Sequence, residues 1–163
     1  MAREIERKFL VCSDAWRAQA VETIPMRQGY LGSGGDVSVR VRIEGNDARL
    51  NLKSATLGVS RDEFEFPLPP DGAREVLDRF CGERCVEKIR HLVPAGRHVF
   101  EVDEFLGSNA GLVVAEIELE SEDEAFERPA WLGDEVSMDP RYYNVRLLEA
   151  PYTTWPEAAR DPA

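Results

Sequence analysis

Apolar and polar residues alternate along much of the chain, and this alternation predicts a protein built mainly of β-strands. In residues 37–43, for example, Val or Ile occupies every second position. Because successive side chains of a strand point to opposite faces, such a segment has one apolar face and one polar face. The same pattern predicts eight strands, at residues 3–11, 24–31, 37–43, 48–54, 60–68, 86–92, 99–105 and 112–119.

The connections between these strands are mostly short, and residues 44–47 (Glu-Gly-Asn-Asp) have the composition of a hairpin turn. Short connections favour antiparallel pairing, and eight antiparallel strands can close around side chains or one small ligand. We therefore expect an α+β fold that is mainly β: an eight-stranded antiparallel closed barrel with a few helices packed outside. It forms a single domain over residues 1–150, followed by a loosely ordered tail over residues 151–163.

The remaining segments predict two or three helices. A short one covers residues 14–19, and Asp71 is placed to cap another over residues 72–80. Pro140 suits the first turn of a third, which runs to about residue 149, and we expect its tyrosine and leucine side chains to serve ordinary packing. Residues 122–131 hold at most one helical turn, broken by a proline.

The polar faces of the strands carry dense charge. Glu4, Glu6 and Lys8 share one face of the first strand, and Arg40 and Arg42 share one face of the third. Two arrangements fit this pattern: the charged faces lie in water over an apolar core, or they point into the barrel while helices cover the apolar faces. The second arrangement requires buried ions to be paired, since an unpartnered buried charge is very costly. The alternation alone does not decide between them.

Composition narrows the classes of function. The 163 residues contain 43% hydrophobic residues and carry a net charge of −11, which fits a globular protein and argues against nucleic-acid binding. We expect no membrane partner, since no apolar run could span a bilayer. Acidic residues by position 4 and an odd count of three cysteines predict a cytoplasmic protein with reduced thiols. A monomer and a homodimer both remain open.

An interior holding rows of both acids and bases would suit one kind of ligand. Arginine binds phosphate oxygens through its planar fork, and lysine acts as a point charge. Clustered carboxylates bind Mg²⁺ or Mn²⁺, and such ions bridge to phosphate. The charge rows therefore favour a small metal–triphosphate complex as the partner.

The ordered set of charged motifs resembles the CYTH family, within the triphosphate tunnel metalloenzymes. The family's N-terminal Glu-x-Glu-x-Lys is matched at residues 4–8, and the resemblance extends to about residue 148. The later matches, in chain order, are Arg40-x-Arg42, Lys53, Arg61-x-Glu63-x-Glu65, Lys88-x-Arg90, Asp103 and Glu116-x-Glu118. This resemblance favours the inward-facing arrangement of the charged rows.

The resemblance implies roles for these residues. One metal ion would orient the triphosphate and a second would activate water, so that two Mg²⁺ or Mn²⁺ ions are expected. The implied catalytic residues are Glu4, Glu6, Glu63, Asp103 and Lys88. The implied substrate-binding residues are Lys8, Arg40, Arg42, Lys53, Arg61, Lys88 and Arg90, with Tyr30 tuning substrate choice. The implied metal ligands are Glu4, Glu6, Glu116 and Glu118, assisted by Glu63 and Asp103.

Several activities occur among proteins of this kind. Short bacterial members resemble inorganic triphosphatases, which convert tripolyphosphate to pyrophosphate and phosphate, and this is the activity we expect. Alternatives are a class IV adenylate cyclase, a thiamine triphosphatase and a non-catalytic polyphosphate-binding module. No adenine pocket is evident, and Trp16, Trp131 and Trp155 fall on outer or terminal segments. His91 and His98 are expected at the surface.

Overall fold

Nine strands make up most of the molecule, in a computed structural model that describes residues 2–54 and 59–160. Eight of them match the predicted strands, and the short β9 was not anticipated. The strands are β1 (Ala2–Val11), β2 (Glu22–Gly34), β3 (Val37–Glu44), β4 (Asp47–Ser54), β5 (Ser60–Leu68), β6 (Cys85–Ala95), β7 (His98–Phe105), β8 (Val113–Glu118) and β9 (Leu132–Glu135).

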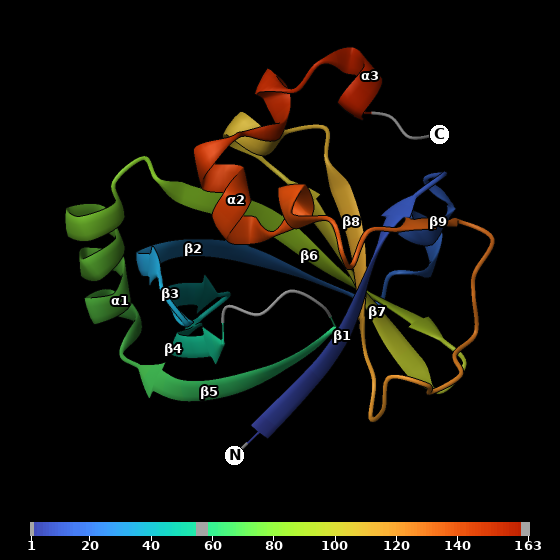
Figure 1. The fold of residues 1–163 in the computed structure, drawn as a ribbon, viewed down its shortest axis with the longest axis horizontal. Helices are drawn as coiled ribbons and strands as arrows, with labels where there is room; N and C mark the ends of the chain where they lie inside the picture. Colours follow the sequence, from blue (N-terminus) through green and yellow to red (C-terminus); the bar gives the residue numbers. More distant parts are fainter. Residues whose placement is uncertain (1, 55–58, 161–163) are drawn as a thin grey trace.

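The first strand closes the sheet into a barrel. The strand order is β5-β4-β3-β2-β6-β7-β8-β1-β9, and β1 also pairs with β5, so that eight antiparallel strands form a closed ring (Figure 1). One edge of β1 pairs with β8, from Glu6 opposite Glu118 to Leu10 opposite Val114. The remaining ladder partners are β5 at the start of β1 and β9 at its end. The expected barrel is therefore confirmed, with one added strand.

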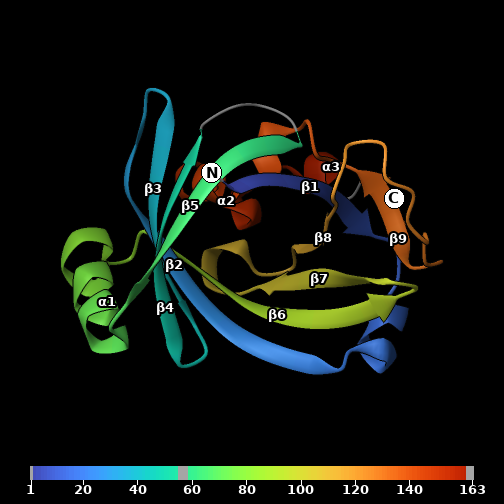
Figure 2. The same cartoon turned by 90° about the horizontal axis from the view of Figure 1, so that it is seen from below.

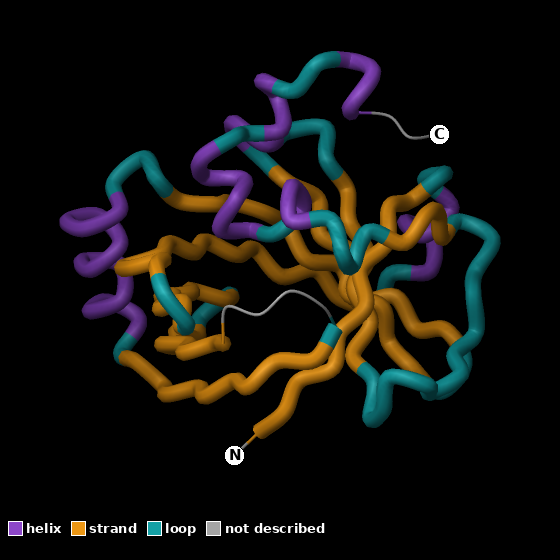
Figure 3. The backbone as a smooth tube through the Cα atoms, viewed as in Figure 1, coloured by secondary structure: helices purple, strands orange, loops and turns teal. Residues whose placement is uncertain are grey.

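The helices pack around the barrel, with those of the C-terminal segment at one of its ends, and their bounds differ from the predicted ones (Figures 2 and 3). The second expected helix starts earlier, with Pro69 at the N-cap, so Asp71 lies inside the first turn and does not cap it. The third is split at Tyr143, and no helix forms in residues 122–131. The helical elements are η1 (Ala15–Gln19), α1 (Pro70–Val76), η2 (Leu77–Cys81), η3 (Gly107–Asn109), η4 (Pro140–Tyr142), α2 (Asn144–Glu149), η5 (Tyr152–Thr154) and α3 (Glu157–Arg160).

Apolar packing stabilises the barrel from outside and at one end. Two of the apolar clusters involve the outward strand faces: one includes Phe9, Trp16 and Trp131, and the other packs α1 and η2 on β3 and β4. The third cluster is different, because Leu10, Phe105 and Val114 share the inward faces of their strands with the charged residues. They pack against side chains of the C-terminal segment, described next. The inward face is therefore charged along most of the barrel and apolar near one end.

The C-terminal segment supplies the partners of that apolar end, so the expectation of a loosely ordered tail is wrong for residues 151–160. The rings of Tyr152 and Trp155 are buried, with centroids 5.1 Å apart. The backbone N–H of Tyr152 donates to Oδ1 of Asn109 at 2.8 Å, which anchors the segment to the loop before β8. The last three residues of the predicted tail, 161–163, lie outside the described residues.

One apolar face lacks the covering helix that the inward arrangement predicts. Phe64 and Phe66 on the outer face of β5 are 44% and 49% exposed. The helical cover on this side of the barrel is α1, which contacts β3 and β4. None of the helices in the described part of the chain is long and apolar enough to cross a membrane.

Candidate functional site

The inward strand faces enclose a cavity of about 680 Å³. This placement confirms that the charged rows point into the barrel. Nearly all of the predicted site residues line the cavity: Glu4, Glu6, Lys8, Tyr30, Arg40, Arg42, Lys53, Arg61, Glu63, Lys88, Arg90, Glu116 and Glu118. The cavity also takes in Glu65 and Glu101 from the same rows.

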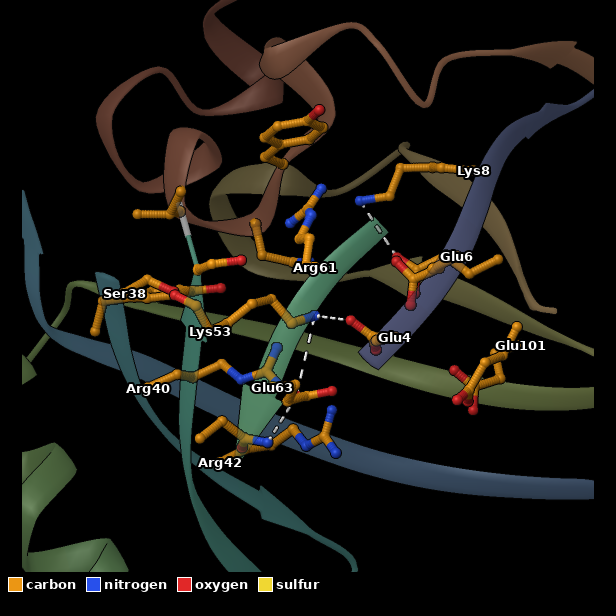
Figure 4. Close-up of a pocket in the computed structure, with 18 of the residues that line it drawn as sticks. Glu4, Glu6, Lys8, Ser38, Arg40, Arg42, Lys53, Arg61, Glu63 and Glu101 are labelled. Atoms are coloured by element: carbon orange, nitrogen blue, oxygen red, sulfur yellow. Dashed lines mark hydrogen bonds and ion pairs between the residues drawn. The ribbon is translucent and has the colours of Figure 1, made fainter. Parts of the chain in front are cut away.

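One wall of the cavity is basic and comes from β3 and β4. Arg40 and Arg42 project from β3 and Lys53 from β4, and Figure 4 shows their charged ends directed toward acids on β1 and β5. Nη2 of Arg40 lies 3.7 Å from Oε1 of Glu63, and Nζ of Lys53 lies 2.6 Å from Oε2 of Glu4. These contacts hold several cations within one enclosed space, where they could bind a polyanion.

The opposite wall contains carboxyl groups that repel one another. Glu6 and Glu118 are direct partners across the β1–β8 ladder, where like charges destabilise a sheet. Burial, followed by the neighbouring Glu116, raises the pKa of Glu6 from 4.5 to about 8. Burial and the nearby Glu4 also raise the pKa of Glu118. A proton is therefore retained at Glu6 at neutral pH in the metal-free protein.

Glu116 behaves in the opposite way because it is surrounded by cations. Its Oε1 lies 3.3 Å from Nζ of Lys8, and its Oε2 lies 3.6 Å from Nη2 of Arg90. Burial alone would raise the pKa of Glu116, but Lys8, Lys88 and Arg90 hold it well below its ordinary value. The cavity thus places an ionised carboxylate close to a carboxyl group that retains its proton.

Asp103 is the one predicted site residue that does not line the cavity. Its side chain is fully buried, and it accepts hydrogen bonds from Nζ of Lys88 at 2.6 Å and from Nε and Nη2 of Arg90 at 2.8 and 2.9 Å. These hydrogen bonds hold the side chains of Lys88 and Arg90 in place from a position outside the cavity lining. The geometry favours a positioning role for Asp103 over the direct metal contact expected from the sequence.

The acidic wall offers a donor set that suits hard divalent cations, which prefer carboxylate oxygens. The raised pKa of Glu6 is the observation that supports this fit, because a bound cation would stabilise the ionised form that burial disfavours. In residues 2–54 and 59–160, no three acidic, thiol or imidazole side chains are grouped as a metal site. Instead, Glu4 contacts Lys53 and Glu116 contacts Lys8.

The C-terminal segment also lines the cavity, through Tyr143, Asn144 and their neighbours. The expected packing role is correct for the buried Tyr142 but wrong for Tyr143, whose ring faces two cavity cations. The sequence holds little signal for this difference, because the two adjacent residues are both tyrosines and neither residue type nor hydropathy distinguishes them. What separates them is the break between η4 and α2.

The other aromatic and imidazole predictions have mixed outcomes. Tyr30 lines the cavity, and its hydroxyl oxygen accepts a hydrogen bond from Nε2 of Gln28 at 3.3 Å. His91 and His98 are not among the lining residues, but they are half-buried rather than at the surface. His91 packs against the ring of Trp16 at 4.8 Å, and His98 contacts Glu124 at 2.7 Å.

A second cavity, of about 590 Å³, shares Arg42 and Glu65 with the first. It is bordered by the β3–β4 turn, where Glu44 and Asp47 lie, and by the start of β2. The two cavities therefore meet at these shared residues.

Comparison with known proteins places this geometry in context. A family model described as the CYTH domain matches residues 2–143. An inorganic triphosphatase of Acetivibrio thermocellus is 43% identical over 157 residues, covering 96% of this chain and 100% of that protein. An inorganic triphosphatase of Nitrosomonas europaea is 38% identical over 149 residues, covering 88% and 95%. The crystal structure of an inorganic triphosphatase superposes with a TM-score of 0.65 at 34% identity, covering 91% of this chain and 95% of that chain.

Proposed function

Since the chain belongs to the CYTH family, we propose that it hydrolyses inorganic tripolyphosphate to pyrophosphate and phosphate with the help of divalent metal ions. The observation that carries this proposal is the cavity with arginine and lysine on one wall and a cluster of carboxyl groups on the other. In a linear polyanion with bound metal ions, the phosphate oxygens can contact the basic wall and the metal ions can contact the carboxyl groups of the acidic wall. A neutral ligand would offer these charged groups neither a counterion nor a charge-assisted hydrogen bond.

The basic residues bind and orient the phosphate chain in this proposal. Arg40 and Arg42 offer planar donor forks from neighbouring positions on one face of β3. Lys88 and Arg90 are held in place by Asp103 and present their cationic groups from β6, which β2 alone separates from β3. Fixed cations stabilise the charge that shifts onto the phosphate oxygens as the terminal phosphoanhydride bond breaks.

The acidic residues Glu4, Glu6, Glu116 and Glu118 would hold Mg²⁺ or Mn²⁺, with Glu63 assisting. A bound divalent cation supplies neutralisation of phosphate charge and lowers the pKa of a water molecule. The carboxyl group of Glu6 must release its proton before it can serve as a ligand, because its pKa is about 8. We propose two such ions, and a cytoplasmic location supported by three free cysteines.

A substrate panel tests the proposal. Phosphate release is measured from tripolyphosphate, ATP, thiamine triphosphate and long-chain polyphosphate, each with Mg²⁺ or Mn²⁺ at controlled pH, and cyclic AMP is assayed in the ATP reactions. We expect tripolyphosphate to be the preferred substrate by kcat/KM. The Glu6→Gln variant, purified in parallel, reports contaminating phosphatases. Equal or faster turnover of ATP, or formation of cyclic AMP, would contradict the proposed substrate.

A further inference from the structure

Tyr143 lies between the two helical elements of the C-terminal segment, and its ring faces two cations from different strands. Nζ of Lys8 on β1 lies 5.5 Å from the ring centroid, and the guanidinium carbon of Arg61 on β5 lies 4.7 Å from it. All three residues line the cavity. The electron-rich face of an aromatic ring attracts cations at these distances. One ring therefore contacts two cations at the same time.

The ring is held in place from its far end. Its hydroxyl donates to the carbonyl oxygen of Ser137 at 2.8 Å. Ser137 is itself fixed, because its Oγ accepts from the backbone N–H of Lys8 at 2.9 Å and donates to Glu135 at 2.8 Å. The position of the ring is thus tied to the same strand that carries Lys8.

The residues on each side of Tyr143 contact cavity lysines as well. The carbonyl oxygen of Tyr142 accepts from Nζ of Lys8 at 3.2 Å, and Oδ1 of Asn144 accepts from Nζ of Lys88 at 3.4 Å. Three successive residues therefore contact cations that the sequence resemblance implies to be substrate-binding residues. Packing against the apolar end of the barrel would not require any of these polar contacts.

From this geometry we infer that Tyr143 is a positioning residue, whose ring sets Lys8 and Arg61 side by side so that both bind the same phosphate group of the substrate. This inference rests on the proposed function, since it takes a polyphosphate as the ligand. Without the ring, the two cations repel each other and spread over more conformations, so that binding a phosphate between them costs more entropy. In this inference the ring orients the two cations and takes no part in the chemical step.

Two variants separate the ring from the hydroxyl. Tyr143→Phe and Tyr143→Leu both lose the hydrogen bond to Ser137, but only Phe keeps an aromatic face. Tripolyphosphate binding is measured by calorimetry in metal-free buffer, together with the unfolding temperature of each variant. We expect the Leu variant to bind about tenfold more weakly than the Phe variant, which matches the size of a partly buried cation–π contact. The Phe variant should stay within about threefold of the wild type.

A third substitution shows whether the effect passes through Arg61. In an Arg61→Gln background, the difference between Phe and Leu at position 143 should become smaller, because one of the two cations is gone. Equal affinities of the Phe and Leu variants in the wild-type background would overturn the inference, as would an undiminished difference in the Arg61→Gln background. Binding is measured without turnover, so wild-type protein that binds tripolyphosphate but fails to hydrolyse it would contradict the proposed function and leave this inference standing.

Discussion

Glu6 and Glu118 face each other directly across the ladder between β1 and β8, inside the barrel. Two carboxyl groups in such a place are destabilising unless one is protonated or a cation binds between them. Burial first, and the neighbouring Glu116 next, raise the pKa of Glu6 to about 8, so that this carboxyl group keeps its proton without metal. Proton and metal should therefore compete for the same group.

This competition predicts a pH dependence of metal binding. Below pH 8 the Glu6 carboxyl retains its proton, so a binding cation must displace it, and affinity should increase as the pH rises from 6 toward 8. Calorimetric titration with Mn²⁺ in buffers of different ionisation enthalpy measures the protons released. We expect proton release at pH 7 and less of it at pH 9. Affinity that does not change over this range would show that Glu6 does not bind the metal.

Glu6→Gln should abolish metal-dependent turnover while stabilising the metal-free fold at alkaline pH. The folded pKa of about 8 lies above the ordinary value of 4.5, so the folded state binds the extra proton between these limits. The contribution of Glu6 to the free energy of unfolding is therefore fully present below pH 4.5, and it is lost as the pH rises through 8. A neutral amide avoids that loss. We expect the variant to unfold at least about 2 °C above wild type at pH 9 without metal, and near wild type at pH 5.

Arg42→Ala should mainly weaken tripolyphosphate binding. The side chain lines the junction of the two cavities, and charge-assisted bonds from a guanidinium to phosphate are among the stronger protein hydrogen bonds. We expect KM to rise about tenfold or more and kcat to fall less. Arg74→Ala provides the control, since Arg74 is half exposed on α1 and pairs with the exposed Asp71. A control variant as impaired as Arg42→Ala would point to net charge rather than to a specific contact.

Asp103→Asn should be the most destabilising of the charge substitutions. The carboxylate neutralises Lys88 and Arg90 in a fully buried position, and breaking a buried pair leaves charge without compensation. We expect a loss of about 3–5 kcal/mol in the free energy of unfolding, measured by urea titration. Asp71→Asn is the matched control at an exposed pair on α1, where about 0.5 kcal/mol or less is expected. Similar losses at both positions would contradict a structural role for Asp103.

Gly29→Ala tests the packing of η2 on β2. A Cβ atom at Gly29 would lie 2.6 Å from Sγ of Cys81 and 2.9 Å from Cδ2 of Leu77, whereas none of the described atoms lies within 4 Å of one at Gly32. We expect Gly29→Ala to lower the free energy of unfolding by about 1–3 kcal/mol through overpacking. Gly32→Ala on the same strand should change it by less than about 0.5 kcal/mol. An equal loss at both glycines would show that strand propensity, not packing, limits this position.

The sequence predicted the barrel and most of its lining because strand periodicity assigns every second residue to the same face. Once Glu4, Glu6 and Lys8 are assigned to one face, the remaining rows follow strand by strand. Two kinds of feature could not be found this way. With four residues, β9 is too short to show an alternation of apolar and polar positions. Its pairing depends on the part of the β1 edge that β5 leaves free. Tyr143 and Trp155 owe their places to tertiary packing, which local hydropathy does not encode.

The dual pairing of β1 also has a consequence for the order in which the chain can fold. β1 is synthesised first, yet its ladder partners are Glu63 on β5 and Glu118 on β8, which are far later in the chain. Such long-range pairing is slow, because a large loop must close before any contact forms. Residues 2–5 of β1 can pair with β5 earlier, but Glu6 and the residues after it lack their β8 partners until residues 113–118 have been synthesised. A nascent or truncated chain therefore has exposed strand edges that can aggregate, and the catalytic interior forms only when the ring closes.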